Sequence, residues 1–247
     1  MIIEKYIHPK SKEGLTNLDE NFPFPSHFLG IIMGKPGSGK THLLKFLLKS
    51  KSLFFKRFDF VFIMTPSKVE YIDLFLPDIN FCSELDFDWI EEKIKYVNAI
   101  NKKKDQYSNV LLIIDDLVAD LKSDSQNKRL LSLIFNRRHR IDNVKKNKIF
   151  LFSFFSSKKK GMLSIISTTQ KYRTLPTAFR VTSTFIIAFK NNPSEIKTIS
   201  EELIYSNVDF LSIFNDIFFN KKYGDKNFII YNIDNNKIFA DFELIYS

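Results

Sequence analysis

The chain has 247 residues and a mass of 29.1 kDa, which suits one large α/β domain or a domain with added segments. Hydrophobic residues make up 44% and charged residues 26%, which excludes a long disordered chain or a collagen-like one. The net charge of +9 suits a polyanionic partner, because excess Lys and Arg attract anions to the surface.

Lysine is abundant and arginine is scarce. Lysine has A/T-rich codons, so codon bias explains part of the positive charge without any function. Five of the seven arginines nevertheless lie within forty-five residues, and Arg180 follows closely. Such grouping favours a use of the planar, always-charged guanidinium. The five are Arg129, Arg137, Arg138, Arg140 and Arg173.

The single cysteine, Cys82, excludes an internal disulfide and is typical of a reducing compartment. The four His residues and Cys82 lack the spacing of a zinc site. No signal peptide is visible, and the longest apolar run, 149–155, is far too short to span a bilayer. We expect a soluble intracellular protein with an extended lead-in at 1–25 and one domain at 26–247.

Short apolar runs alternate with helical patterns along the chain. Such alternation predicts an α/β fold with a mainly parallel central sheet and helices on both faces. The last two runs flank an Asp-Asn-Asn turn and predict a C-terminal β-hairpin. The expected strands are 28–33, 58–64, 110–114, 163–168, 184–189, 227–231 and 237–239, and the expected helices are 43–48, 86–104, 126–140, one opening at 193, and 208–219.

The first strand runs directly into a match to G-x-x-x-x-G-K-[ST], and a helix follows it. Glycines in this motif let backbone N–H groups turn inward and cradle phosphate oxygens at the helix N-terminus. Lys40 is placed to reach the β- and γ-phosphates of ATP, and the Thr41 hydroxyl to bind Mg²⁺. The motif consists of Gly34, Lys35, Pro36, Gly37, Ser38, Gly39, Lys40 and Thr41.

Two carboxylates and a glutamine follow later strands. Asp115 ends the strand 110–114 and is expected to hold Mg²⁺ through water, and Asp116 is placed to polarise an attacking water as general base. Many ATPases of this kind carry Glu at the second position. If the first strand lies between the third and fourth, Gln170 points at the γ-phosphate; a plain loop glutamine is the alternative.

The arginines at the end of the helix 126–140 allow two interpretations. One of Arg137, Arg138 and Arg140 could be an arginine finger that stabilises charge on the transferred phosphoryl group. Alternatively, they form a basic helix C-terminus that interacts favourably with the helix dipole. Arg173 and Arg180 could act in the same way or contact DNA phosphates.

Four segments together resemble the genome-packaging ATPases of the FtsK–HerA superfamily, and most of all the poxvirus-type branch of large DNA viruses, virophages and polinton-like elements. They are 34–41, 112–116, 136–140 and 164–176 with Arg180, and the resemblance covers roughly 28–190. It implies an oligomeric ring ATPase that pumps double-stranded DNA into a preformed capsid. Gln170 would be its sensor glutamine, and an arginine finger would reach across a subunit interface.

The segment 142–160 departs from these relatives, in which the arginines lead almost directly into the next strand. Its Lys, Phe, Ser and Asn residues could form a DNA-contact loop, but we favour a low-complexity insertion. If this segment is folded, the placement of Arg138 and Arg140 changes.

We therefore expect a RecA-like P-loop ATPase domain that uses ATP and Mg²⁺ to move double-stranded DNA. A HerA-type helicase or translocase is one alternative, although the short N-terminal segment argues against it. A nucleotide-gated DNA-binding module with slow hydrolysis is another, favoured if Asp116 cannot act as base. A small-molecule kinase is a weaker alternative, since no lid or substrate segment is evident.

Overall fold

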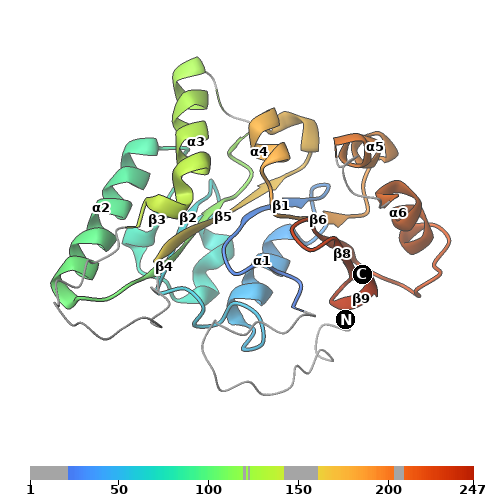
Figure 1. Ribbon diagram of the computed structural model, residues 1–247, viewed down its shortest axis with the longest axis horizontal. Coiled ribbons are helices and arrows are strands. Elements are labelled where there is room, and N and C mark those ends of the chain that lie inside the picture. The colour runs from blue at the N-terminus through green and yellow to red at the C-terminus, as the bar shows by residue number, and fades with distance from the viewer. Residues whose placement is uncertain (1–21, 119–120, 122, 142–160, 203–208) are drawn as a thin grey trace, which may run out of the picture.

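The computed structural model describes residues 22–118, 121, 123–141, 161–202 and 209–247. The central feature is a nine-stranded sheet with the order β3-β2-β4-β5-β1-β6-β7-β8-β9 (Figure 1). Strands β1 to β6 pair in parallel, and β7, β8 and β9 continue the sheet in antiparallel fashion. The expected insertion 142–160 and most of the expected lead-in lie outside the described residues.

The predicted α/β class and mainly parallel sheet are confirmed, while several short elements were not predicted. These are β3, β9 and α4, so the predicted C-terminal hairpin is part of a three-stranded antiparallel unit. None of the helices in the described ranges is both long and apolar enough to cross a membrane. The strands are β1 (Leu29–Met33), β2 (Phe60–Met64), β3 (Phe81–Cys82), β4 (Asn109–Ile114), β5 (Met162–Thr169), β6 (Phe185–Phe189), β7 (Phe228–Asn232), β8 (Lys237–Ala240) and β9 (Glu243–Tyr246), and the helices are α1 (Lys40–Lys49), α2 (Phe87–Lys104), α3 (Asp124–Asn136), α4 (Thr177–Val181), α5 (Pro193–Glu202) and α6 (Phe210–Phe218).

The strand order corrects one expectation. The placement of Gln170 was argued for a sheet with the first strand between the third and fourth, but β5 lies between β4 and β1. The Gly34 N–H also donates to the Thr169 carbonyl over 3.1 Å, which continues the pairing of β1 with β5 beyond the strand ends. As a result, the carboxyl ends of β4, β5 and β1 lie next to one another, and the residues that follow these strands share one edge of the sheet.

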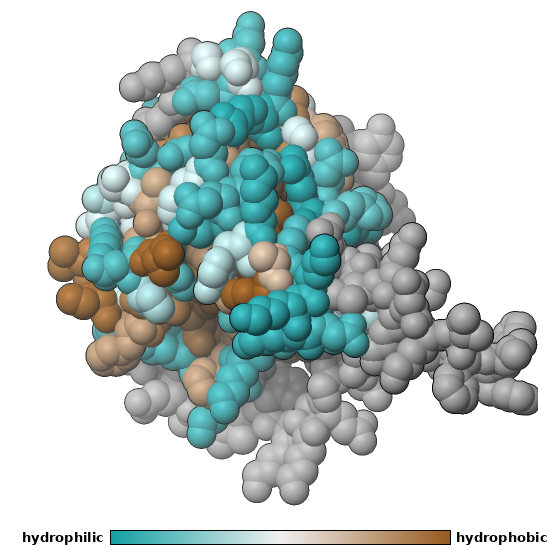
Figure 2. Space-filling model, turned by 90° about the vertical axis from the view of Figure 1, so that its left-hand side faces the viewer, coloured by the Kyte–Doolittle hydropathy of each residue, from teal (hydrophilic) through white to brown (hydrophobic). Residues whose placement is uncertain are grey.

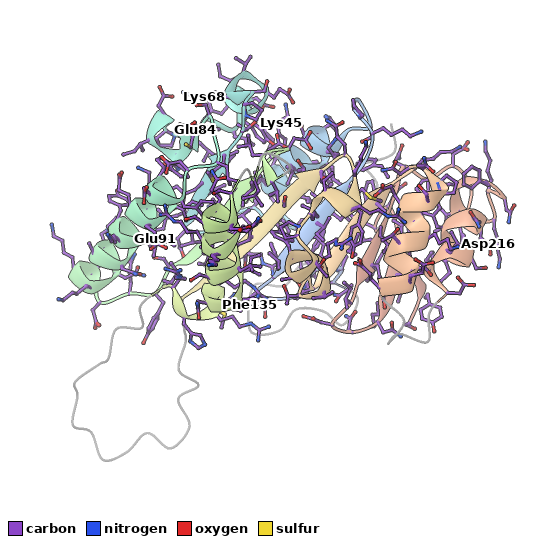
Figure 3. The ribbon with its side chains drawn as sticks, turned by 90° about the horizontal axis from the view of Figure 1, so that it is seen from above. Lys45, Lys68, Glu84, Glu91, Phe135 and Asp216 are labelled. Carbon is purple, nitrogen blue, oxygen red and sulfur yellow. The ribbon has the colours of Figure 1, made fainter. Side chains whose placement is uncertain are left out.

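Two apolar cores cover the two faces of the sheet. Along β1, Ile31 and its alternate neighbours pack with α2, α3, α5 and α6, whereas Ile32 packs with Leu44 and Leu47 of α1. Figure 3 shows Lys45 of α1 and Phe135 of α3 on opposite sides of the sheet. Helix α1 is therefore fixed to the sheet by its own core, directly after the glycine-rich loop.

A buried arginine inside an aromatic cluster binds the segment that precedes β1. Arg57 is 6% exposed, and its Nη2 donates to the carbonyls of Pro25 and Ser26. Burial lowers the pKa of Arg57 to about 9, so the guanidinium remains charged at neutral pH. Four rings surround it at 5.3–5.7 Å: Phe22, Phe28, Phe54 and Phe58.

Replacing Arg57 with Ala is expected to lower the free energy of unfolding by about 2–4 kcal/mol, since it leaves a cavity between the rings and removes both carbonyl bonds. The control is Arg129→Ala. Arg129 pairs with the exposed Asp88, and an exposed pair contributes less than about 1 kcal/mol. Denaturant unfolding of both variants measures the difference, and equal losses would contradict a stabilising role for the cluster.

Candidate nucleotide-binding site

The loop between β1 and α1 has the backbone that a phosphate cradle needs. Gly37 and Gly39 have φ of 73° and 99°, in the left-handed region that side chains with a Cβ rarely adopt. At Gly34 a Cβ would lie 2.3 Å from Ser38 Oγ, so a larger residue would displace Ser38. Ser38 Oγ is buried and has no hydrogen-bond partner within the described part of the chain. This arrangement fits a phosphate group.

Lys40, at the start of α1, lies across this loop. Its side chain is nearly buried, and Nζ donates to the Gly34 carbonyl at 2.9 Å and the Lys35 carbonyl at 3.4 Å. The same Nζ lies 3.7 Å from Asp116 Oδ2. The cation predicted to reach the phosphates is thus held between the loop and the second carboxylate.

Asp115, directly after β4, is a buried carboxylate surrounded by hydroxyl donors. Thr168 Oγ1 donates to Oδ1 at 2.6 Å, while Tyr71 and Thr65 donate to Oδ2 at 2.7 and 3.3 Å. Burial raises the pKa of Asp115, and the hydrogen bonds from Thr168 and Tyr71 act in the opposite direction. These bonds hold the carboxylate in one orientation at the edge of the sheet.

Asp116 has a left-handed backbone, with φ of 54°. Its N–H donates to Thr168 Oγ1 at 2.9 Å, so one threonine of β5 contacts both aspartates. Asp116 and Gln170 line the same pocket of about 200 Å³, and Asn191 Nδ2 donates to the Gln170 carbonyl at 3.3 Å. The structure therefore brings the predicted base and the predicted sensor together.

The arginines of the predicted finger lie elsewhere. After α3 ends at Asn136, residues Arg137–His139 form a 3-10 turn beside the start of β5, at the sheet edge opposite the glycine-rich loop. Arg137 is buried and donates to the Ile134 carbonyl at 3.0 Å, and Arg140 pairs with Glu91 of α2 at 2.8 Å. None of them reaches the nucleotide site of its own chain.

Arg173 and Arg180 also have partners within the domain. Arg173 Nε donates to Thr198 Oγ1 of α5 at 2.7 Å. Arg180, on α4, lies 3.1 Å from Glu202 and faces the ring of Tyr172. Both side chains therefore connect the segment after β5 to α5.

Tyr71, Thr65 and Thr168 complete the site but were not predicted from the sequence. Thr168 lies in the Thr-Thr-Gln segment, so its place beside Gln170 was a usable signal. Thr65 immediately follows β2, and the end of a strand beside β4 was a weaker signal. Tyr71 carries no sequence signal, because it comes from the 3-10 turn Lys68–Leu74 and meets Asp115 only through tertiary packing.

Two oxygen groups are placed to hold a metal ion. Thr41 follows Lys40 on α1 and is half-buried, and its side chain lies near the Tyr71 hydroxyl, which donates to Asp115. A hydroxyl and a carboxylate are the oxygen ligands that Mg²⁺ prefers, with water in the remaining positions. The side chains present fit the predicted metal.

Comparison with known proteins identifies the family. The profile of the poxvirus A32 protein family matches residues 21–145, slightly more than half of the chain. The chain belongs to the poxvirus A32 protein family. This membership confirms the predicted resemblance to the poxvirus-type branch, and it confirms an ATPase at the level of the family. No curated protein sequence matches the chain.

Solved structures of a viral protein share the fold of this A32 family member. The genome packaging NTPase B204 from Sulfolobus turreted icosahedral virus 2, in complex with sulfate, is 18% identical with a TM-score of 0.56 and covers 87% of this chain and 96% of its own. Its complex with AMPPCP gives 18% identity, a TM-score of 0.53, and 87% and 97% coverage. B204 from Sulfolobus turreted icosahedral virus, described as its DNA-packaging ATPase, is 18% identical with a TM-score of 0.53. The match covers 87% of this chain and 96% of B204. These likenesses confirm the P-loop NTPase fold.

The tight packing around Gly34 in the glycine-rich loop leads to a testable prediction. Gly34→Ala is expected to raise the dissociation constant for ATP about tenfold or more, because its Cβ displaces Ser38. Adding Ser38→Gly removes the closest clash and should restore part of the affinity, although Phe189 Cβ remains 3.1 Å away. Calorimetric titration with a non-hydrolysable ATP analogue measures both variants. Unchanged binding by Gly34→Ala would contradict a phosphate cradle at this loop.

Proposed function

We propose that this A32 family member is an ATP-hydrolysing motor that moves double-stranded DNA and packages a viral genome into a preformed capsid. The observation that carries the proposal is the convergence of Lys40, Asp115, Asp116 and Gln170 at one edge of the sheet. Phosphoryl transfer relies on positioning and charge stabilisation, and this edge offers a cation, a buried carboxylate, a second carboxylate and an amide.

Each group has a proposed role in hydrolysis. The loop 34–39 holds the phosphates, and Lys40 moves from its loop carbonyls to the β- and γ-oxygens. Thr41 and Asp115 hold Mg²⁺, which when bound neutralises charge on the phosphates. Asp116 accepts a proton from the attacking water, and Gln170, across the same pocket, orients that water.

We place the nucleotide base in a hollow beside the glycine-rich loop, on the β6 side. Its volume is about 580 Å³, and the ring of Phe219 is 51% exposed. A purine base can stack on such a ring, and the neighbouring amides can donate to or accept from its polar edge. The hollow is lined by Lys35, Lys190, Asn191, Asn192, Pro193 and Phe219.

A ring of copies is part of the proposal, with Arg138 or Arg140 as a finger in trans. Both lie far from the nucleotide site of their own chain, so only the site of a neighbouring copy is available to them. A finger of this kind requires Arg140 to leave Glu91. B204 is a genome packaging NTPase, which supports the capsid role but concerns that protein.

Three substitutions separate the roles at the site. Lys40→Ala is expected to lower ATP turnover by about 100-fold or more, since it removes the cation at the γ-phosphate. Asp116→Asn should keep nucleotide binding and lower turnover by about 100-fold or more, because it removes the base and keeps the shape. Asp115→Asn should also weaken metal-dependent binding. Turnover assays and nucleotide titrations measure these effects; identical behaviour of the two Asn variants refutes the division of roles.

Double-stranded DNA should stimulate ATP turnover without sequence preference. Binding through phosphates releases counterions, so affinity should fall by about 10³-fold or more between 50 and 200 mM salt if the ring contacts six or more phosphates. Turnover with and without DNA, at several salt concentrations, measures both. No stimulation would favour a nucleotide-gated binding module, and strand separation without translocation on duplex DNA would favour a helicase.

A further inference from the structure

Tyr71 is a buried side chain between the two groups proposed to hold the metal. It is fully buried, yet it belongs to a surface 3-10 turn, Lys68–Leu74, that follows β2. Its hydroxyl donates to Asp115 Oδ2 at 2.7 Å, and the side chain of Thr41 lies near the same hydroxyl. The phenol therefore joins the turn to the end of β4, close to the start of α1.

The turn that carries Tyr71 is attached to the same helix as Thr41. Asp73 lies 3.3 Å from Lys45 and 2.7 Å from Lys49, both on α1. Figure 3 shows Lys45 and Lys68 on the same side of the sheet. Because the turn is joined to α1 at Asp73 and to β4 through Tyr71, the distance between Thr41 and Asp115 depends on this segment.

Two apolar residues of the turn, and a third directly after it, face solvent. Val69, Ile72 and Phe75 are 79%, 74% and 92% exposed, whereas Tyr71 is turned inward. Apolar residues gather along one edge of the face that Figure 2 presents. Leu74 packs against the apolar core that contains Tyr71, and the hydroxyl of Tyr71 adds the polar contact that joins this turn to Asp115.

We propose that Tyr71 is a positioning residue that holds Asp115 and Thr41 at the separation needed to bind the metal of the metal–nucleotide complex. Tyr71 and Thr65 donate to Oδ2, whereas Oδ1 accepts from Thr168 and has a second lone pair that can face a metal-bound water. Groups that orient metal ligands in this way typically change metal affinity about 10- to 100-fold when removed. The proposal rests on the proposed function, because it takes Thr41 and Asp115 as metal ligands.

The test is Tyr71→Phe, which removes the hydroxyl and keeps the ring. The control is Tyr231→Phe on β7, another fully buried tyrosine whose hydroxyl donates at 2.8 Å to a side-chain oxygen, that of Asn236. Binding of Mn²⁺ is measured by electron paramagnetic resonance at a saturating concentration of a non-hydrolysable ATP analogue. We expect Tyr71→Phe to raise the Mn²⁺ dissociation constant about tenfold and Tyr231→Phe to leave it within twofold of wild type.

Turnover gives a second measurement. With Tyr71→Phe, the Mg²⁺ concentration for half-maximal turnover should rise about tenfold, whereas with Tyr231→Phe it should stay within twofold of wild type. A purely structural role would lower the unfolding temperature and leave both metal constants unchanged, and that outcome overturns the proposal. Tighter metal binding by Tyr71→Phe also overturns it, since the hydroxyl would then compete with the metal.

A milder variant tests the proposal if Tyr71→Phe does not fold. Asp73→Asn weakens the attachment of the turn to α1 at a partly exposed side chain, and we expect a smaller rise in the Mn²⁺ dissociation constant, about threefold. An unchanged constant in Asp73→Asn, with Tyr71→Phe unfolded, overturns the proposal. Loss of Mn²⁺ binding by the wild-type chain with the ATP analogue would instead refute the proposed function itself.

Discussion

Asp115 is a carboxylate removed from water at the end of β4, and a carboxylate in that position needs a donor for each oxygen. The donors come from three separate elements: Thr65 after β2, Tyr71 in the turn that follows, and Thr168 at the end of β5. The neighbouring strands must end together for these contacts to form. The geometry of the nucleotide site therefore depends on the register in which β2, β4 and β5 pair.

The sequence predicted well those parts of the fold whose signal is local. The runs that became β1, β4 and β6 are continuous apolar segments, as expected for strands buried on both faces. The glycine-rich motif needed only its flanking strand and helix to be recognised. The two-residue β3 and the five-residue α4 have too few residues to produce a periodic pattern, so they were missed.

The residues of the site also differ in whether a local sequence signal predicts them. Asp115, Asp116 and Gln170 follow strands directly, so parallel pairing alone predicts that they share an edge. Tyr71 lies in a turn in which Val69 and Ile72 are exposed, and its role depends on how that turn packs on α1. The strand order could not be read from any local sequence pattern. The pairing of the strands places β5 between β4 and β1, and this brings Thr168 to both aspartates.

The left-handed backbone of Asp116 has a consequence for which acid can occupy that position. A short side chain that bonds locally tolerates positive φ better than a longer one, so aspartate suits this turn better than glutamate would. The shorter acid reaches less far. With Asp116 as the proposed base, the attacking water would have to lie closer to the carboxyl end of β4 than it would beside a glutamate.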